Sequence, residues 1–142
     1  MKRLTAGLAV SALATAATVL GMAAPALASS PTCRVTAHTP YLSVGDVTAL
    51  GDVSCSATAT YTFTVTLWRN NGNGTYKSYP YTYKNLVDTG GTFDNFTTCV
   101  TGNGTRQWHT EVSISWKIYH GSSLQASGSS SSNSSDIDLG CN

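Results

Sequence analysis

The stretch ATYTFTVTLWRN, residues 59–70, alternates large apolar side chains with threonine. Its apolar positions, each two residues apart, are Tyr61, Phe63, Val65 and Leu67. Because side chains on a strand point alternately to opposite faces, this alternation predicts a strand with one buried face. Threonine is β-branched and favours extended backbone, so the other face supports the same conformation.

A second stretch, QWHTEVSISWKIYH, residues 107–120, has the same period. One face of this strand would carry Trp108, Thr110, Val112, Ile114, Trp116 and Ile118. The other face would carry His109, Glu111, Ser113, Ser115, Lys117 and Tyr119. We expect these two stretches to be the central strands of the fold.

Shorter β-like runs surround them, and Gly and Asn fill the gaps between the runs. They cover residues 34–38, 47–54, 76–84, 93–100, 122–127 and 137–141. No segment after the leader keeps a helical period. Short strands with turn signals at this spacing predict an all-β fold, an antiparallel β-sandwich with an Ig-like layout. A barrel is the alternative architecture.

The first 28 residues have the pattern of a signal peptide. Lys2 and Arg3 precede an apolar, Ala- and Leu-rich run, and Ala26-Leu27-Ala28 gives the small residues that a signal peptidase requires. We therefore expect residues 1–28 to be removed and residues 29–142 to form a single secreted, extracellular domain. This leader is interrupted by Gly and Pro and ends at a cleavage site, which favours export over a membrane anchor.

Charge gives the domain no basis for binding nucleic acid. Without Lys2 and Arg3, six of the eight basic residues remain against seven acidic ones, so the formal charge is −1. The basic residues are scattered along the chain, whereas a nucleic-acid interface needs a clustered basic surface. No later segment is apolar enough to span a bilayer, so we expect no membrane partner.

The four cysteines fall in the exported domain, and an even number in an oxidising compartment predicts disulfides. Of the three possible connectivities we favour Cys33–Cys55 and Cys99–Cys141, because each closes a local loop and fixes one end of the domain. A zinc site is disfavoured because the chain contains no CxxC pair.

Two segments are predicted to be connections between strands. The sequence Gly-Asn-Gly-Thr occurs at residues 72–75 and again at 102–105, and Asn-Gly is a strong signal for a hairpin turn. We interpret the repeat as a reused turn rather than a reused ligand loop. The segment SGSSSSNSSD, residues 127–136, is low in complexity, and we expect a mobile loop there.

Catalytic groups are sparse. His38, His109 and His120 are the only bases for neutral pH, and no nucleophile motif accompanies them. His109 and Glu111 share a strand face, but two ligands on one strand are weak support for a metal or an acid–base pair. We therefore expect no enzyme activity, catalytic residue, metal or cofactor.

The aromatic residues are the better candidates for a binding surface. In the run YPYTY, residues 79–83, every second residue is tyrosine, so in a strand all three rings lie on one face. Pro80 lacks a backbone donor, which places this strand at a sheet edge or outside the sheet. The rings either cover the core or contact a protein or a sugar. The candidate partner-binding residues are Trp68, Tyr76, Tyr79, Tyr81 and Tyr83.

A family resemblance rests on the leader, on the four cysteines and on two stretches, VSCSATATYTFTVTLWRN and GTRQWHTEVSISW. The chain resembles small secreted β proteins of actinobacteria, and among these the small adaptor subunit of umbrella toxin particles. The resemblance is architectural, covers residues 29–142 and assigns no binding residue. It implies a protein that links lectin-bearing subunits to a large toxin-carrying scaffold.

From these observations we expect a secreted interaction module, an adaptor in an extracellular antibacterial toxin complex whose partners are other secreted proteins. Two alternatives stay open. One is a secreted inhibitor of a foreign hydrolase, which would present an exposed loop. The other is a carbohydrate-binding module, which would use Tyr and Trp rings as stacking platforms.

Overall fold

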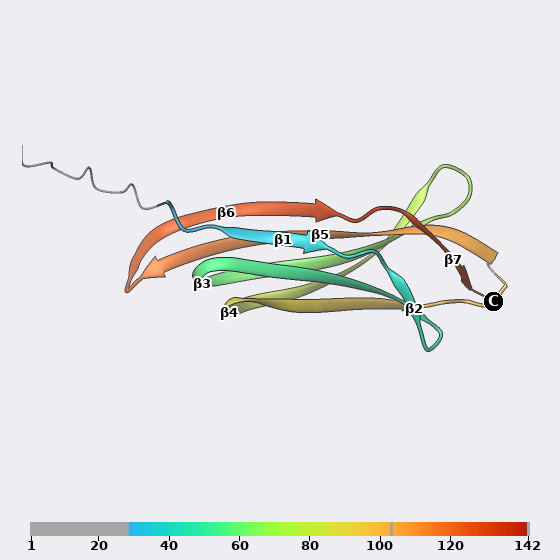
Figure 1. Cartoon of the computed structure of the whole chain (residues 1–142), viewed down its shortest axis with the longest axis horizontal. Coiled ribbons are helices and arrows are strands. Elements are labelled where there is room, and N and C mark those ends of the chain that lie inside the picture. The colour runs from blue at the N-terminus through green and yellow to red at the C-terminus, as the bar shows by residue number, and fades with distance from the viewer. Residues whose placement is uncertain (1–28, 103, 142) are drawn as a thin grey trace, which may run out of the picture.

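The computed structural model describes residues 29–102 and 104–141, and the expected signal peptide at 1–28 lies outside the described residues. Every regular element in these ranges is a strand, and the strands form one antiparallel sheet (Figure 1). In chain order they are β1 (Cys33–Ala37), β2 (Tyr41–Ser43), β3 (Asp46–Asn70), β4 (Tyr76–Thr98), β5 (Gly104–His120), β6 (Ser123–Asn133) and β7 (Ile137–Cys141). The predicted all-β, antiparallel class is confirmed.

The sheet is continuous and curls over itself as a half-barrel, so the layout differs from a sandwich of two separate sheets. The cause is the length of β3 and β4, which form one long hairpin. Both strands bend at the same end of the molecule and run back (Figure 1). The first half of β3 (46–54) pairs with β1 and with the second half of β4 (90–98). The second half of β3 (59–70) pairs with β5 and with the first half of β4 (76–88).

Two local features allow the bend. The segment between the two predicted strands of β3 contains no Gly, Pro, Asn or Asp, so the chain continues through an irregular register instead of a turn. Opposite it, Gly90 has a φ of 138°, and an added side chain there would collide with the carbonyl group of Val53. Only glycine fits this conformation, so β4 can follow β3 around the bend.

The alternating pattern of the two long strands is confirmed, because their apolar residues face the inside of the curled sheet. Phe63 is fully buried, and its ring centroid lies 5.1 Å from that of Phe93 on the second half of β4. Gly51 lies against Phe63 and Val112, where a β-carbon would have no room. The apolar core, apart from cysteines, consists of Val47, Ala49, Val53, Ala59, Tyr61, Phe63, Val65, Leu67, Trp108, Val112, Ile114, Trp116 and Ile118.

Thr110 is the exception on the inner face of β5. It is fully buried, and its hydroxyl has no hydrogen-bond partner among the described residues. Valine has nearly the same shape without the hydroxyl, so Thr110→Val should raise the free energy of unfolding by about 1 kcal/mol. Urea denaturation of the two proteins measures this difference. A destabilised variant would show that the hydroxyl is hydrogen-bonded in solution.

Both favoured disulfides are present. Cys33 on β1 lies directly opposite Cys55 on β3, so this bridge reinforces a pair of neighbouring strands. Cys99, which follows β4, is bonded to Cys141 at the end of β7. The second bridge therefore joins the end of the long hairpin to the last strand, which otherwise pairs only with β5.

The expectation of a mobile serine-rich loop at 127–136 is wrong. Residues 127–133 belong to β6, which pairs with β5 along most of its length, and only 134–136 connect β6 to β7. Backbone hydrogen bonds hold this strand, and they do not depend on apolar side chains. Gly128 pairs with Trp116, whose indole Cζ2 would be 2.8 Å from a β-carbon at that position, so the ring covers β6 closely.

The first Gly-Asn-Gly-Thr copy is a turn, as predicted. It joins β3 to β4, and Gly72 and Gly74 both have positive φ angles. The Oδ1 atom of Asn73 accepts hydrogen bonds from the backbone N–H and the hydroxyl of Thr75, which fixes the loop internally. In the second copy, between β4 and β5, Gly102 and Gly104 also have positive φ, and Asn103 lies outside the described residues.

Candidate functional site

The five predicted partner-binding residues lie on both faces of the sheet. Trp68 and Tyr76 point outward, and Trp68 pairs with His109 across β3 and β5. Tyr79, Tyr81 and Tyr83 lie on the inner face, as their spacing predicted. They are opposite Leu67, Val65 and Phe63 of β3. The five residues therefore form two separate groups, Trp68 with Tyr76 and Tyr79 with Tyr81 and Tyr83.

The inner group divides again by burial. Tyr79 and Tyr83 are partly buried and pack against the core, whereas Tyr81 is 54% exposed. The ring centroid of Tyr83 lies 4.9 Å from those of both Tyr81 and Phe93. Tyr83 thus contacts both the exposed ring of Tyr81 and the core. The group therefore contributes buried side chains to the core and one exposed ring to the surface.

Strand β4 is an edge strand, because β3 is its only ladder partner within residues 29–102 and 104–141. The edge position predicted from Pro80 is confirmed. Exposed apolar side chains also lie on this strand, with Phe96 at 62% and Val87 at 68% exposure. Lys77, Lys84 and Pro80 limit indiscriminate pairing with other strands, as edge charges and prolines generally do.

Because β4 bends back, its two halves face each other across an opening of the curled sheet, which we call the seam. Two side chains bridge the seam in opposite directions. The hydroxyl of Tyr83 donates to the backbone oxygen of Asp94 at 2.8 Å and also lies 3.1 Å from its Oδ1. The Nδ2 of Asn95 donates to the backbone oxygens of Tyr79, at 2.5 Å, and Val65, at 2.9 Å.

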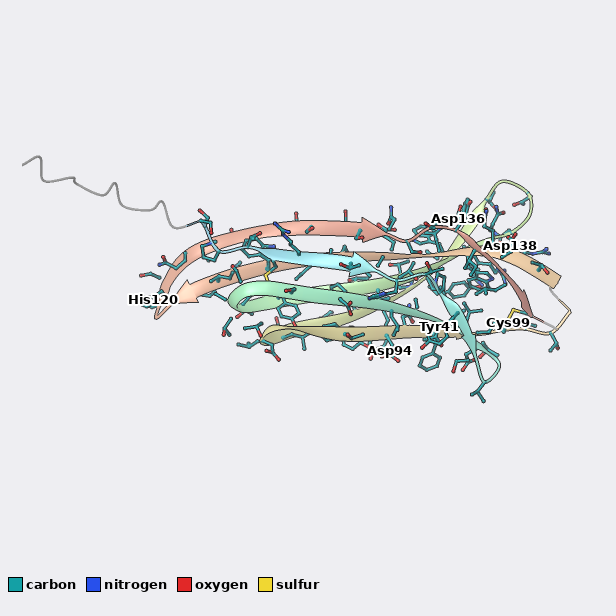
Figure 2. All side chains as sticks on the ribbon, viewed as in Figure 1. Tyr41, Asp94, Cys99, His120, Asp136 and Asp138 are labelled. Atoms are coloured by element: carbon teal, nitrogen blue, oxygen red, sulfur yellow. A yellow bond between two sulfur atoms is a disulfide. The ribbon has the colours of Figure 1, made fainter. Side chains whose placement is uncertain are left out.

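A hollow of about 300 Å³ opens at the seam, lined by Tyr81, Tyr83, Asp94, Asn95 and Phe96. We call it the seam hollow. Burial raises the pKa of the Tyr83 hydroxyl, and its hydrogen bond to the Asp94 carboxylate raises it further. The phenol therefore stays protonated and continues to hold the carboxylate. Asp94 lies on β4, on the opposite side of the molecule from Asp136 and Asp138 (Figure 2).

Sequence reasoning found Tyr81 and Tyr83 but missed Asp94, Asn95 and Phe96. The available signal was Asn95, a polar residue two positions after Phe93 and therefore on the inner face of a predicted strand. A buried amide needs hydrogen-bond partners, so its position marks a specific contact. The strand that accepts the hydrogen bonds of this amide could not be predicted. The bend that brings the two halves of β4 together has no recognisable local pattern in the sequence.

Asn95→Ala should lower the free energy of unfolding by about 1–3 kcal/mol, because it removes the buried donor of the seam. Denaturant unfolding measures the change. Asn133→Ala, at an exposed position at the end of β6, is the control and should stay within about 0.5 kcal/mol of the wild type. Equal effects of the two substitutions would contradict a structural role for the Asn95 amide.

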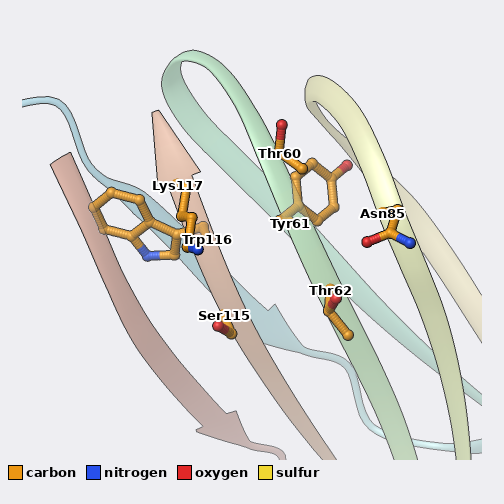
Figure 3. Close-up of a pocket in the computed structure, with 7 residues that line it drawn as sticks. All are labelled: Thr60, Tyr61, Thr62, Asn85, Ser115, Trp116 and Lys117. Atoms are coloured by element: carbon orange, nitrogen blue, oxygen red, sulfur yellow. The ribbon is translucent and has the colours of Figure 1, made fainter. Parts of the chain in front are cut away.

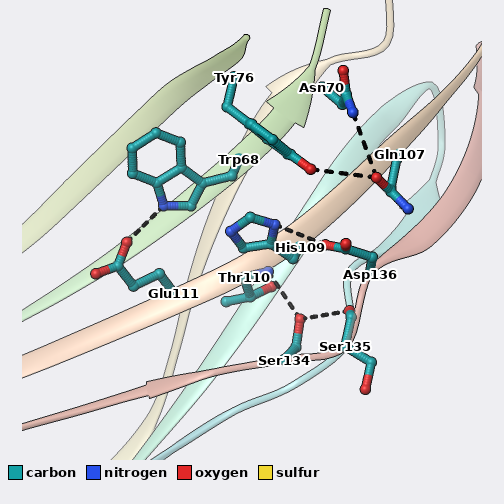
Figure 4. A network of polar contacts seen from close by, with 10 residues as sticks. All are labelled: Trp68, Asn70, Tyr76, Gln107, His109, Thr110, Glu111, Ser134, Ser135 and Asp136. Carbon is teal, nitrogen blue, oxygen red and sulfur yellow. Dashed lines mark hydrogen bonds and ion pairs between the residues drawn. The ribbon is translucent and has the colours of Figure 1, made fainter. Parts of the chain in front are cut away.

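A second group of polar and aromatic side chains lies on the outer face (Figure 4). The ring of His109 stacks on Trp68 with a centroid distance of 6.1 Å and lies 5.6 Å from Tyr76. Its Nδ1 is 2.9 Å from Oδ1 of Asp136, and the indole N–H of Trp68 donates to Glu111 at 2.7 Å. We call these five residues the outer cluster. His109 and Glu111 share a face as predicted, but each is bonded to another residue of the cluster.

A smaller hollow of about 200 Å³ lies beside the register shift between Tyr61 and Phe63 (Figure 3). Its polar groups are threonine and serine hydroxyls, the phenol of Tyr61, the indole N–H of Trp116, the amide of Asn85 and the ammonium of Lys117. This set has no carboxylate and no histidine, and its one charged group is a cation. We therefore take the seam hollow and the outer cluster as the two candidate sites.

Within residues 29–102 and 104–141, no three or more His, Cys, Asp or Glu side chains are grouped so that they could hold a metal ion. The same ranges contain no helix long and apolar enough to cross a membrane.

Comparisons with known proteins assign the chain to no family. A scan against protein-family models, a search of curated proteins and a search of solved structures each found no match.

Proposed function

We propose that this protein is a secreted, non-enzymatic adaptor that binds other secreted proteins through the open edge of β4. The observation that carries the proposal concerns the part of the chain that the structure describes. There, this long strand pairs on one side only and presents exposed Tyr81, Val87 and Phe96. An extended segment of a partner would add to this edge by backbone hydrogen bonds, and side-chain pockets would select the partner.

Several features of the fold favour a specific partner over indiscriminate pairing. Lysines and a proline interrupt the edge, so a matching strand must accommodate them. The two disulfides stiffen the scaffold that presents the edge, and a preorganised surface loses less entropy on binding. The resemblance of the sequence to umbrella toxin adaptors supports an extracellular antibacterial toxin complex as the proposed assembly.

Size-exclusion chromatography of native culture supernatant, with mass spectrometry of what co-elutes with the affinity-tagged protein, tests the proposal. We expect elution in a large particle together with a scaffold-like protein. The variant Val87→Lys/Phe96→Lys should elute as a monomer, because it places two charges on the edge. Leu124→Lys is the matched control on β6, since Leu124 is 52% exposed, and it should remain in the particle. A monomeric wild-type protein would overturn the proposal.

The outer cluster favours a second function, carbohydrate binding. Its aromatic rings are held in place by hydrogen bonds to side chains, and such rings bind the apolar faces of sugars while neighbouring carboxylates bind the hydroxyls. Retention on chitin, cellulose and peptidoglycan columns tests this function. It should be lost in Trp68→Ala and kept in Tyr119→Ala, which removes an exposed ring of β5 outside the cluster.

A further inference from the structure

The polar side chains of the seam hollow are nearly all hydrogen-bond acceptors. The hydroxyl proton of Tyr83 is directed at Asp94, and both protons of the Asn95 amide are used by backbone oxygens across the seam. The groups left for a ligand are the second carboxylate oxygen of Asp94, the amide oxygen of Asn95 and the hydroxyl of Tyr81. Of these groups only the Tyr81 hydroxyl can also donate, so the lining favours a ligand that mainly donates hydrogen bonds.

The remaining walls of the hollow are aromatic. Tyr81 and Tyr83 meet edge to face at an interplanar angle of 65°, and Phe96 adds a third ring to the lining. The face of an aromatic ring attracts cations, and a carboxylate beside the rings strengthens that attraction. A lining of rings, one carboxylate and free acceptors therefore has the chemistry of a cation site.

The basic residues nearest to the aromatic side chains of the described sheet contact other rings, outside the seam hollow. Lys77 covers the neighbouring ring of Tyr79, with its Nζ 5.0 Å from the ring centroid, and Arg69 lies over Trp108 at 5.9 Å. No basic side chain is among the residues that line the seam hollow. Tyr81 is thus an exposed tyrosine of β4 in a hollow that also contains a carboxylate, and no basic side chain of the described residues lines that hollow.

We infer that the seam hollow binds an arginine side chain presented by the partner protein, an inference that rests on the proposed function. The guanidinium group is planar, carries five donors and no acceptor, and stays charged at every relevant pH. It can stack on Tyr81 while its N–H groups reach Asp94 and the amide oxygen of Asn95. An ammonium group of lysine has no planar face to stack, so arginine fits both parts of the lining better.

NMR titration of the wild-type protein with acetyl-arginine-amide tests the inference without any partner. We expect saturable shifts of the backbone amides of residues 81–83 and 94–96. Acetyl-citrulline-amide has the same shape without the charge and should bind at least about tenfold more weakly. Acetyl-lysine-amide should also bind more weakly than arginine. No shifts, shifts elsewhere on the protein, or equal binding of arginine and either analogue would overturn the inference.

A matched pair of variants tests the same site in the assembly. Asp94→Asn removes the charge but keeps the Oδ1 acceptor for Tyr83, and Asp138→Asn removes a charge on the opposite side of the molecule (Figure 2). Unchanged thermal unfolding confirms that both variants fold. We expect Asp94→Asn to weaken incorporation into the particle by at least about tenfold and Asp138→Asn to leave it unchanged. If both variants assemble equally, the arginine site is overturned while the adaptor proposal stands. If the wild type forms no particle, the adaptor proposal fails and the titration alone decides the site.

Discussion

Phe63→Ala should lower the free energy of unfolding by about 3–5 kcal/mol, because it leaves a cavity where the two halves of the curled sheet meet. The ring is fully buried, packs against Phe93 and lies over Gly51 on the opposite half of β3. The close approach at Gly51 leaves no side chain there that could move in to fill the space. Guanidinium denaturation with the disulfides intact measures the loss.

The matched control is Phe96→Ala, which removes the same side chain from an exposed position of β4. That variant should stay within about 0.5 kcal/mol of the wild type. If both substitutions cost the same, Phe63 does not occupy the interior described here.

Replacing both Cys99 and Cys141 by serine should cost about 4 kcal/mol. The bridge closes a loop with a sequence separation of 42, and the entropy that such a loop removes from the unfolded chain corresponds to this amount. Denaturant unfolding of the double variant measures the total. The loss should be concentrated in β7, which depends on the bridge and on its pairing with β5.

Hydrogen exchange separates this effect from a general loss of stability. Amide protection in β7 should fall first in the Cys99→Ser/Cys141→Ser protein. The control, Cys33→Ser/Cys55→Ser, opens a bridge with a separation of 22 between β1 and β3 and should leave β7 protected relative to the rest of the sheet. Identical exchange patterns in the two variants would contradict a local role for the second bridge.

The strands and the disulfides could be predicted because their signals are local. In residues 59–70 the alternation of apolar residues with threonine determines both the strand and its buried face. The cysteine pairing was predicted because each bridge closes a local loop and fixes one end of the domain. Tyr79, Tyr81 and Tyr83 were placed on one face by their spacing, and Pro80 correctly indicated an edge.

What could not be predicted depends on contacts between distant segments. The sandwich layout was not confirmed. The predicted strands ended at residue 54 and began again at residue 59, but the chain bends between them and stays paired with β4 on both sides of the bend. The Ser-rich segment was assigned to a loop because its composition lacks apolar residues, yet β5 supplies the backbone partners that make it a strand. The seam hollow requires both the bend and the register of β4. The position of Asn95 on an inner strand face marked a contact, but no local pattern indicated that Tyr79, Tyr83 and Asp94 would meet it there.

The folded hairpin of β3 and β4 has a consequence for how the chain reaches this structure. Its pairs extend from Asn70 with Tyr76, beside the turn, to Asp46 with Thr98 at the far end. Each residue pair that forms outward from the turn brings the next pair close together. The chain therefore closes only a short loop at each step, and its conformational entropy falls in small steps. A chain that emerges from its amino terminus can complete this hairpin before β5 appears. The turn at Gly72 and Gly74 is therefore the expected starting point of folding. It sets the register of the pairs next to it, up to the first register shift at Tyr61 and Phe63.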